Sequence, residues 1–317
     1  MGLITDLSVV VATHNAAAVI VESLQALCAQ RVLEPVEHVE RIEIIEPVEG
    51  VEIIVADSST DETPALVRSF TGVRLLHFEE PLTIPELRGR GVAVANGGVI
   101  AILDPFAIVA GNWTREVLKA HRESPHPVIG GAVDLHERYD SSLFAWAIYI
   151  NEYGLFMPPV EGGAVAIVPG CNVSYKRAAL FDGDRPRFEV FWKTFVNWDL
   201  QNAGAVLWLA PNICVRLVKP VPFMGFLSSR FDHGRCFAGM RRAAWSPWRR
   251  SVYAAASVLL PPLMLWRWGR VYWAKRRQRT KLVLTLPLQL MLFGVWAVGE
   301  ACGYMLGTGR SCRRLFY

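Results

Sequence analysis

The sequence is poor in charged side chains and has no cysteine or histidine spacing typical of a zinc site. Only 20% of its 317 residues are charged, 52% are hydrophobic, and the mean hydropathy is +0.26. This composition excludes a disordered or collagen-like chain and favours contact with a membrane. The six cysteines include no CxxC pair. We therefore expect reduced, mostly buried thiols and a cytoplasmic compartment, with no structural disulfide or zinc site.

Acidic residues are almost missing from the last third of the chain. From Arg230 onward, 16 Lys or Arg residues accompany only two acids, Asp232 and Glu300, for a net charge of +14. The first 229 residues carry 17 basic and 27 acidic residues, or −10. The total of +4 therefore hides two oppositely charged pieces, and we expect two domains, 1–229 and 230–317.

Two uncharged stretches, 251–266 and 282–299, interrupt the basic piece. A membrane-spanning helix needs about 20 apolar residues, so the second stretch qualifies, whereas the first is short and contains Pro261-Pro262. If both spanned, the most basic loop would lie on the far side, against the positive-inside tendency. One solution is a first segment that lies in the interface, with Arg and Trp side chains at anionic headgroups. One alternative is that both stretches are core helices of a soluble domain. Another is a nucleic-acid-binding surface, but the aromatic residues beside the basic ones are more typical of a membrane interface.

Strand and helix patterns alternate along the first 123 residues. Residues 7–12, 51–56, 73–77 and 99–103 have the pattern of buried strands, and residues 16–30, 63–70, 85–96 and 113–123 that of helices. The alternation predicts an α/β fold with a mainly parallel sheet and helices on both faces. Polar residues follow three of these strands, at the edge where such sheets bind ligands. They are Thr13 and Asn15, Asp57, and Asp104.

Residues 34–52 form a low-complexity insertion between two of these segments. It has glutamate at every third position and a net charge of −6. A period of three fits neither a strand nor an α-helix. We expect an exposed loop or irregular ribbon, a solvated acidic face rather than a cation site.

Four segments in order resemble glycosyltransferase family 2, whose members have the Rossmann-like GT-A fold. They are LSVVVATHN at 7–15, EIIVADSSTDET at 52–63, the run from Arg88 to Asp104, and VPGCNVSYKRAAL at 168–180. SRFDHGR at 229–235, with the basic and apolar segments after it, is similar to membrane-associated members that build exopolysaccharides, such as succinoglycan-type enzymes. The resemblance implies a GT-A domain with C-terminal membrane-associated helices.

The resemblance implies that a nucleotide sugar binds where the first strands end. Asp57 is the candidate for the uracil and ribose, and Arg88 for a phosphate. The alternatives are a helix cap or Asx-turn for Asp57 and a surface role for Arg88. The candidate donor-binding residues are Thr13, His14, Asn15, Asp57, Arg88 and Asp104.

The metal motif of the family is incomplete in this chain. Its D-x-D falls at Asp104-Pro105-Phe106, so Asp104 is the only carboxylate. A diphosphate leaving group needs a divalent cation or fixed positive charges. One carboxylate with phosphates and waters makes a weak site for Mg²⁺ or Mn²⁺, with Asp104 as the metal ligand.

The general base is also missing from its usual place. An inverting enzyme uses a carboxylate to deprotonate the acceptor hydroxyl, and the family supplies it from a Glu-Asp pair before a helix. Depending on the alignment, that pair falls on Trp192-Lys193 or on Val196-Asn197. Asp199 and Glu189 are the only carboxylates of this stretch, so they are the candidate catalytic residues, with an ordinary helix-surface role as the alternative.

Four residues are candidates for binding the acceptor or its phosphate. Asn172 stands in the acceptor-side segment, whereas the family's Gln-x-x-Arg-Trp motif is replaced by Arg230, His233 and Arg235. These three could hold a diphosphate or a polyprenyl-phosphate headgroup. The alternative is a basic patch beside the membrane.

Together these features predict a membrane-bound, inverting hexosyltransferase of the cell envelope, with its catalytic domain on the cytoplasmic face. It would move a sugar from a nucleotide sugar to a lipid-linked or polysaccharide acceptor, with membrane lipids but no nucleic acid as further partners. A second hypothesis is a GT-A scaffold that has lost its metal and base residues and acts as an assembly partner in polysaccharide synthesis. A third is an unrelated soluble α/β protein.

Overall fold

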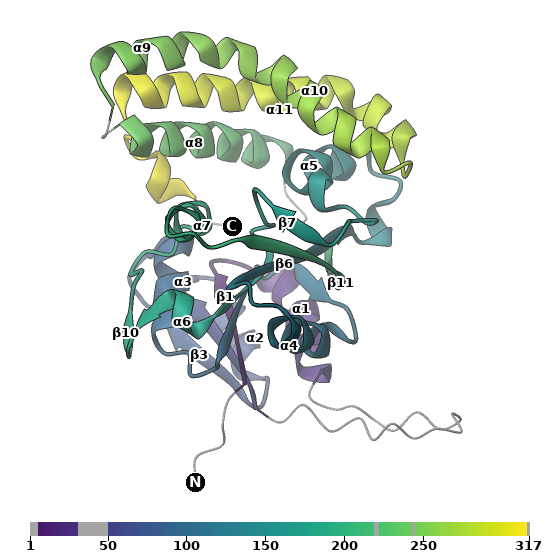
Figure 1. Cartoon of the computed structure of the whole chain (residues 1–317), viewed down its shortest axis with the longest axis vertical. Coiled ribbons are helices and arrows are strands. Elements are labelled where there is room, and N and C mark those ends of the chain that lie inside the picture. Colours follow the sequence, from purple (N-terminus) through teal and green to yellow (C-terminus); the bar gives the residue numbers. More distant parts are fainter. Residues whose placement is uncertain (1–5, 31–49, 219–221, 243–244, 316–317) are drawn as a thin grey trace. The chain divides into compact units, whose positions relative to one another are not determined.

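The computed structural model describes residues 6–30, 50–218, 222–242 and 245–315, so most of the glutamate-rich insertion lies outside the described residues. The chain divides into two compact units (Figure 1). Unit 1 comprises Met1–Asp134 and Pro158–Val218, and unit 2 comprises Leu135–Met157 and Lys219–Phe316. Residue 229, where the net charge changes sign, lies inside a helix of unit 2, α8 (Phe223–Arg242).

Unit 1 is built on a sheet that has nine strands within the described residues. Eight are ordered β3-β2-β1-β4-β8-β6-β11-β5, and β7 pairs with β11. Strands β1 to β4 are parallel, whereas β8 is antiparallel to β4. The strands are β1 (Leu7–Thr13), β2 (Val51–Asp57), β3 (Val73–His77), β4 (Val99–Leu103), β5 (Ala107–Val109), β6 (Val128–Leu135), β7 (Gly163–Val165), β8 (Asn172–Lys176) and β11 (Leu207–Leu217), with a separate hairpin of β9 (Phe181–Asp182) and β10 (Arg185–Pro186).

Helices cover both faces of this sheet, as β8 demonstrates. Successive side chains of a strand point to opposite faces. Val173 and Tyr175 join the apolar cluster beneath α3 and α7, whereas Asn172 and Ser174 bond to side chains of α4. The fold class predicted from the sequence is therefore confirmed. The helices of unit 1 are α1 (Ala17–Ala29), α2 (Thr63–Arg68), α3 (Ile84–Ala93), α4 (Trp113–Glu123), α6 (Arg177–Leu180) and α7 (Lys193–Asn202).

Unit 2 is helical. Its first segment, which contains α5, comes from the middle of the chain, and the rest follows unit 1 (Figure 1). The expected break at Pro261-Pro262 takes the form of a 3₁₀ turn, after which both prolines occupy the first turn of a new helix, where proline is tolerated. The elements are η1 (Glu137–Tyr139), α5 (Leu143–Tyr153), η2 (Gly154–Phe156), α8, α9 (Pro247–Ala256), η3 (Ser257–Leu259), α10 (Leu260–Ala274), α11 (Arg279–Leu306) and η4 (Ser311–Arg314).

Glycines set the close packing of α8 against α11. A Cβ atom at Gly299 would overlap the carbonyl oxygen of Phe231, and one at Gly303 would overlap that of Arg235. Gly234 on α8 meets the backbone of Trp296 in the same way. Small residues four apart on one helix allow two backbones to approach, a pattern also found between membrane helices.

A disulfide joins Cys236 on α8 to Cys312 on η4, so the expectation that the cysteines are reduced is wrong for this pair. The two residues are 76 positions apart in the sequence. They meet because α8 packs along α11 and against η4, and their Cα atoms are 5.0 Å apart. No local spacing could indicate this pairing, which depends on the helix packing. The disulfide also removes the cysteine-based argument for a reducing compartment.

The longer apolar stretch of the sequence forms most of α11. Within the described part of the chain, this is the helix that is long and apolar enough to cross a membrane, with a mean hydropathy of 1.9 over its best window, of which 39% is buried. Several of its apolar side chains are exposed, among them Leu284 and Val298. By itself a helix of this kind is weak support for a membrane span, because buried core helices have the same composition.

Candidate active site

The parallel strands of unit 1 end in polar residues on one edge of the sheet. Thr13 at the end of β1 pairs in register with Asp57 at the end of β2. Asp104 directly follows β4, the other parallel neighbour of β1. We call this edge, with residues 13–15, Asp57 and Asp104, the carboxyl edge. It lies where open α/β sheets bind ligands, as the sequence predicted for these residues.

The loop after β1 is tied to the loop after β2. Asn15 adopts a positive φ of 51°, and its side-chain oxygen accepts hydrogen bonds from the backbone of Thr60 at 2.9 Å and Asp61 at 3.3 Å. His14 donates from Nδ1 to the carbonyl oxygen of Ser58 at 2.9 Å. Thr13 Oγ1 is buried and has no hydrogen-bond partner within the described part of the chain. Two candidate donor-site residues are thus held in a defined loop conformation.

Asp57 is fully buried, and its carboxylate is bonded within the protein. Oδ2 accepts from the backbone N–H of Ser59 at 3.1 Å and from Nδ1 of His77 at 2.6 Å, and Oδ1 accepts from the hydroxyl of Ser59. The bond from the Ser59 N–H closes the Asx-turn that the sequence offered as an alternative role of Asp57. Oδ2 already accepts two bonds, whereas Oδ1 accepts one and has a second lone pair, so the turn and one contact with a ligand are compatible.

Two cationic side chains meet the carboxylate of Asp104. Arg88 on α3 donates from Nη2 to Oδ1 at 2.8 Å, and Lys193 at the start of α7 donates from Nζ to the same oxygen at 3.1 Å. Lys193 also donates to the carbonyl oxygen of Gly170. The three side chains are only 9–11% exposed. We call Arg88 and Lys193 the cation pair.

Local contacts hold the cation pair in position. Helix α3 begins with a capping box, in which the side chain of Glu86 accepts from the backbone N–H of Thr83 at 2.7 Å and that of Thr83 accepts from the N–H of Glu86. The backbone N–H of Phe191 donates to the carbonyl oxygen of Pro85 at 2.8 Å. At Gly89 the absence of a side chain lets the segment before α7 lie directly against α3.

Burial and charge shift the pKa values of this cluster. Burial raises the pKa of Asp104, but Lys193 and Arg88 outweigh it, so the net shift is downward and Asp104 is a carboxylate. Burial and then the neighbouring Arg88 lower the pKa of Lys193 to about 8, against the opposing attraction of Asp104. The cluster carries one negative and two positive charges when Lys193 is protonated.

The residues around Asp104 do not fit a divalent cation. Asp104 is the only carboxylate of the D-x-D position, and its Oδ1 already accepts from the cation pair. The described residues contain no group of three or more His, Cys, Asp or Glu side chains that could hold a metal ion. Like charges about 4 Å apart repel by roughly 4 kcal/mol per unit charge near a protein surface, which further disfavours a cation beside Lys193.

The two candidate general bases lie on the surface. Glu189 is in the segment before α7, and Asp199 lies six residues after Lys193 on that helix; both are exposed. Six helical residues rise about 9 Å along the axis. The structure does not bring either carboxylate into the cluster of Asp104 and the cation pair.

Asn172 lies at the start of β8 and is buried among structural bonds. Its side-chain N–H groups donate to the carbonyl oxygens of Ala132 at 2.9 Å and Ile213 at 3.1 Å, and its oxygen accepts from Trp113 at 3.0 Å. These bonds give Asn172 a packing role between strands and α4.

The other candidate acceptor residues belong to α8 in unit 2. Arg230 is buried and donates to Glu152 at 2.8 Å and to Nδ1 of His233 at 3.0 Å. Arg235 donates from Nε to the carbonyl oxygen of Gly307 at 3.1 Å. These contacts connect α8 with α5 and with the end of α11, so each arginine has a structural partner within unit 2.

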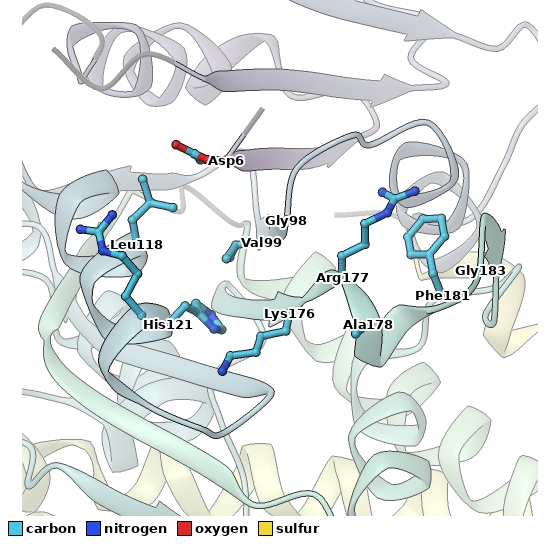
Figure 2. Close-up of a pocket in the computed structure, with 11 residues that line it drawn as sticks. Asp6, Gly98, Val99, Leu118, His121, Lys176, Arg177, Ala178, Phe181 and Gly183 are labelled. Atoms are coloured by element: carbon cyan, nitrogen blue, oxygen red, sulfur yellow. The ribbon is translucent and has the colours of Figure 1, made fainter. Parts of the chain in front are cut away.

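A basic cavity lies at the opposite edge of the sheet from Asp104. It has a volume of about 720 Å³ and includes His121, Lys176 and Arg177 (Figure 2). It also includes Asp6, just before β1, and Gly98, just before β4, and so adjoins the amino ends of these parallel strands. This position separates the cavity from the carboxyl edge.

Sequence reasoning missed the role of Lys193. The signal was present, because one alignment placed Trp192-Lys193 where the family has its Glu-Asp pair. A lysine in place of a carboxylate cannot be assigned a function from the sequence alone, because its function depends on the side chains that it contacts. Those neighbours, Asp104 and Arg88, lie 89 and 105 positions earlier in the chain.

Residues 8–181, more than half of the chain, match the model of the family described as glycosyl transferase family 2. No curated protein sequence matches the chain.

Solved structures with a similar fold include TarS from S. aureus in complex with UDP-GlcNAc, at 15% identity, a TM-score of 0.50 and coverage of 74% of this chain. The match spans 66% of that TarS chain, slightly less than two thirds. Another is the mannosyltransferase PcManGT from Pyrobaculum calidifontis in complex with GDP-Man and Mn²⁺, at 19% identity and a TM-score of 0.50, with coverage of 91% of this chain and 86% of that one. These likenesses concern the fold.

Proposed function

Because the chain belongs to glycosyl transferase family 2, we propose that it is a membrane-bound inverting glycosyltransferase. It moves a hexose from a nucleotide sugar to a lipid-linked or polysaccharide acceptor. The observation that carries the proposal is the carboxyl edge, where Thr13, Asp57 and Asp104 lie at the ends of three parallel strands and Asp104 contacts two buried cations. Buried charges at the ligand-binding edge of an α/β sheet suit a substrate with a diphosphate.

In the proposed reaction the acceptor oxygen attacks the anomeric carbon from the side opposite the diphosphate, which inverts the configuration. The acceptor hydroxyl loses its proton to a base, and the bond between the anomeric carbon and the phosphate oxygen breaks. Asp199 and Glu189 are the candidate bases, and both are exposed to solvent. Unchanged transfer by an Asp199→Ala variant would remove Asp199 from this role.

Calorimetric titration with UDP and GDP tests the proposal. The purified protein is titrated with each nucleotide, once with Mn²⁺ and once with EDTA, and we expect at least one nucleotide to bind under one of these conditions. Absence of binding in all four titrations would overturn the proposed function. Binding without hydrolysis or transfer of a nucleotide sugar, tested with membrane lipid extract as acceptor source, would instead favour the non-catalytic scaffold.

The membrane part of the proposal rests on the outer surface of α9, η3 and α10. Large apolar side chains are exposed there, and arginines stand beside them. The most exposed are Trp248 at 78%, Val258 at 74%, Leu259 at 63% and Trp266 at 60%. Arg249 lies over the ring of Trp245 and Arg270 over that of Trp266. Such a surface suits the boundary between anionic headgroups and acyl chains, and the basic flanks favour the cytoplasmic side.

A double substitution, Val258→Asp with Leu259→Asp, should weaken binding to vesicles that contain an anionic lipid by at least tenfold. Each apolar side chain of this size contributes about 1.5–3 kcal/mol when it leaves water, and about 1.4 kcal/mol corresponds to a factor of ten. Flotation with vesicles measures the partition. Ile167→Asp with Val206→Asp, which alters two exposed residues of unit 1, is the matched control. Equal losses in both double variants would contradict an interfacial role for this surface.

A further inference from the structure

The charges around Asp104 bear on how a diphosphate is neutralised. The carboxylate receives two buried cations on the same oxygen, Arg88 at 2.8 Å and Lys193 at 3.1 Å. With Lys193 protonated, two positive charges and one negative charge leave a net +1 next to the end of β4. A buried excess of positive charge is costly unless an anion compensates for it. The cluster is therefore suited to receive an anionic group.

A nitrogen of Arg88 is the second feature of the cluster that bears on a ligand. Nε of Arg88 is buried and has no hydrogen-bond partner within the described part of the chain. A buried guanidinium N–H normally donates a hydrogen bond, and a buried donor without an acceptor requires an explanation. A phosphate oxygen is a strong acceptor that arginine binds in a forked geometry. The unpaired N–H donor and the excess positive charge both indicate an anionic ligand that accepts hydrogen bonds, such as a phosphate.

We propose that the cation pair of Lys193 and Arg88 takes the place of a divalent cation, so that the donor diphosphate is bound without Mg²⁺ or Mn²⁺. This inference rests on the proposed function, because it concerns the same nucleotide-sugar donor. Asp104 then has a different task from that of a metal ligand. It fixes two side-chain cations at the carboxyl edge, which is what the hydrogen bonds to its Oδ1 do in the structure.

The chemistry of the transfer agrees with this assignment. When the bond between the anomeric carbon and the phosphate oxygen breaks, its electron pair stays on the phosphate, and the leaving nucleoside diphosphate gains one negative charge. The acceptor oxygen forms the new bond to the anomeric carbon and releases its proton to a base or to water. Fixed ammonium and guanidinium groups stabilise the developing charge in the way that a metal ion does. Lys193 and Arg88 supply such groups without a further reactant.

The position of Lys193 in the chain supports the exchange. It lies in the stretch where the family usually has its Glu-Asp pair. At Asp104-Pro105-Phe106 the second carboxylate of D-x-D is replaced by phenylalanine. The phenylalanine removes a negative charge that a metal ion would need. The lysine adds a positive charge in contact with the remaining carboxylate, that of Asp104. Both departures from the family pattern thus disfavour a metal ion and favour the binding of an anion.

The test is calorimetric titration of the full chain with UDP and with GDP. For the nucleotide that binds, we expect dissociation constants in EDTA and in Mn²⁺ to agree within about twofold. Lys193→Met, which keeps the length of the side chain without its charge, should weaken binding at least tenfold in EDTA. Lys193→Arg should retain most of the affinity, because a cation remains. Lys119→Met removes a lysine that is exposed on α4 and should bind like the wild type.

The outcomes separate the inference from the proposed function. Binding by the wild type that disappears in EDTA and returns with Mn²⁺ would overturn the inference and leave the proposed function intact. Binding by a folded Lys193→Met variant equal to that of the wild type would also overturn it. No binding of either nucleotide under any condition would overturn the proposed function itself. If Lys193→Met does not fold, as judged by circular dichroism, the comparison of EDTA with Mn²⁺ on the wild type still decides the question.

Discussion

Replacing Asp104 by asparagine should lower the free energy of unfolding by about 3–5 kcal/mol, which is the usual cost of leaving a buried charge without its partner. The substitution keeps the shape of the side chain and removes the one negative charge that the cation pair contacts. Arg88 and Lys193, each with a side chain only 11% exposed, would then face each other without an intervening anion. Urea unfolding followed by circular dichroism measures the loss.

Asp182→Asn is the control for this prediction, since it removes an exposed carboxylate from the hairpin strand β9 of the same unit. Its unfolding free energy should stay within about 0.5 kcal/mol of the wild type. If Asp104→Asn were as stable as the wild type, the carboxylate would not be the anchor of the cation pair. If Mn²⁺ raised the melting temperature of the wild type and not of Asp104→Asn, Asp104 would be a metal ligand after all.

The second large effect is expected at the crossing of α8 and α11. Gly299→Leu places a side chain where even a Cβ atom would overlap the Phe231 carbonyl oxygen, so the two helix backbones must separate. Overpacking of this kind typically costs 1–3 kcal/mol, and more when the obstacle is backbone. We expect the melting temperature of unit 2 to fall by about 5–10 °C, since 1 kcal/mol corresponds to a few degrees in a chain of this size.

Gly294→Leu provides the comparison within the same helix. A Cβ atom at Gly294 meets nothing within 4 Å, and leucine is the better helix former. This variant should be at least as stable as the wild type. Thermal unfolding in detergent, followed at 222 nm, measures both. Equal melting temperatures for the two leucine variants would show that α8 and α11 do not pack as closely as the glycines indicate.

The fold of unit 1 could be predicted because its information is local. Strands such as β2 contain a continuous buried apolar run, here residues 53–56, and the polar residue that follows the run marks the carboxyl end of the strand. The resemblance to the family added the GT-A fold and gave Asp57 and Asp104 candidate roles in donor binding. The match of residues 8–181 to the family model confirms the family, and the roles of the two aspartates stay predictions.

The remaining features depend on contacts between distant residues. Lys193 acquires its role from Asp104, 89 positions away, and Cys236 from Cys312, 76 positions away. Likewise, the positive charge of Arg230 was visible in the sequence, but its partner Glu152 lies 78 positions earlier in a segment that the charge pattern did not connect with the helical unit. Composition and periodicity depend on residues that are close together in the sequence, so they do not predict contacts between residues that are far apart in it.

The bond between Cys236 and Cys312 closes a covalent ring that includes α9, α10 and α11. A single nick by a protease anywhere within this ring leaves both fragments attached to one another. The two pieces would migrate together on a denaturing gel and separate only after a reductant is added. Hence a single cut inside the ring cannot release α9, α10 or α11 while the bond is intact, and removing one of them requires either two cuts or prior reduction.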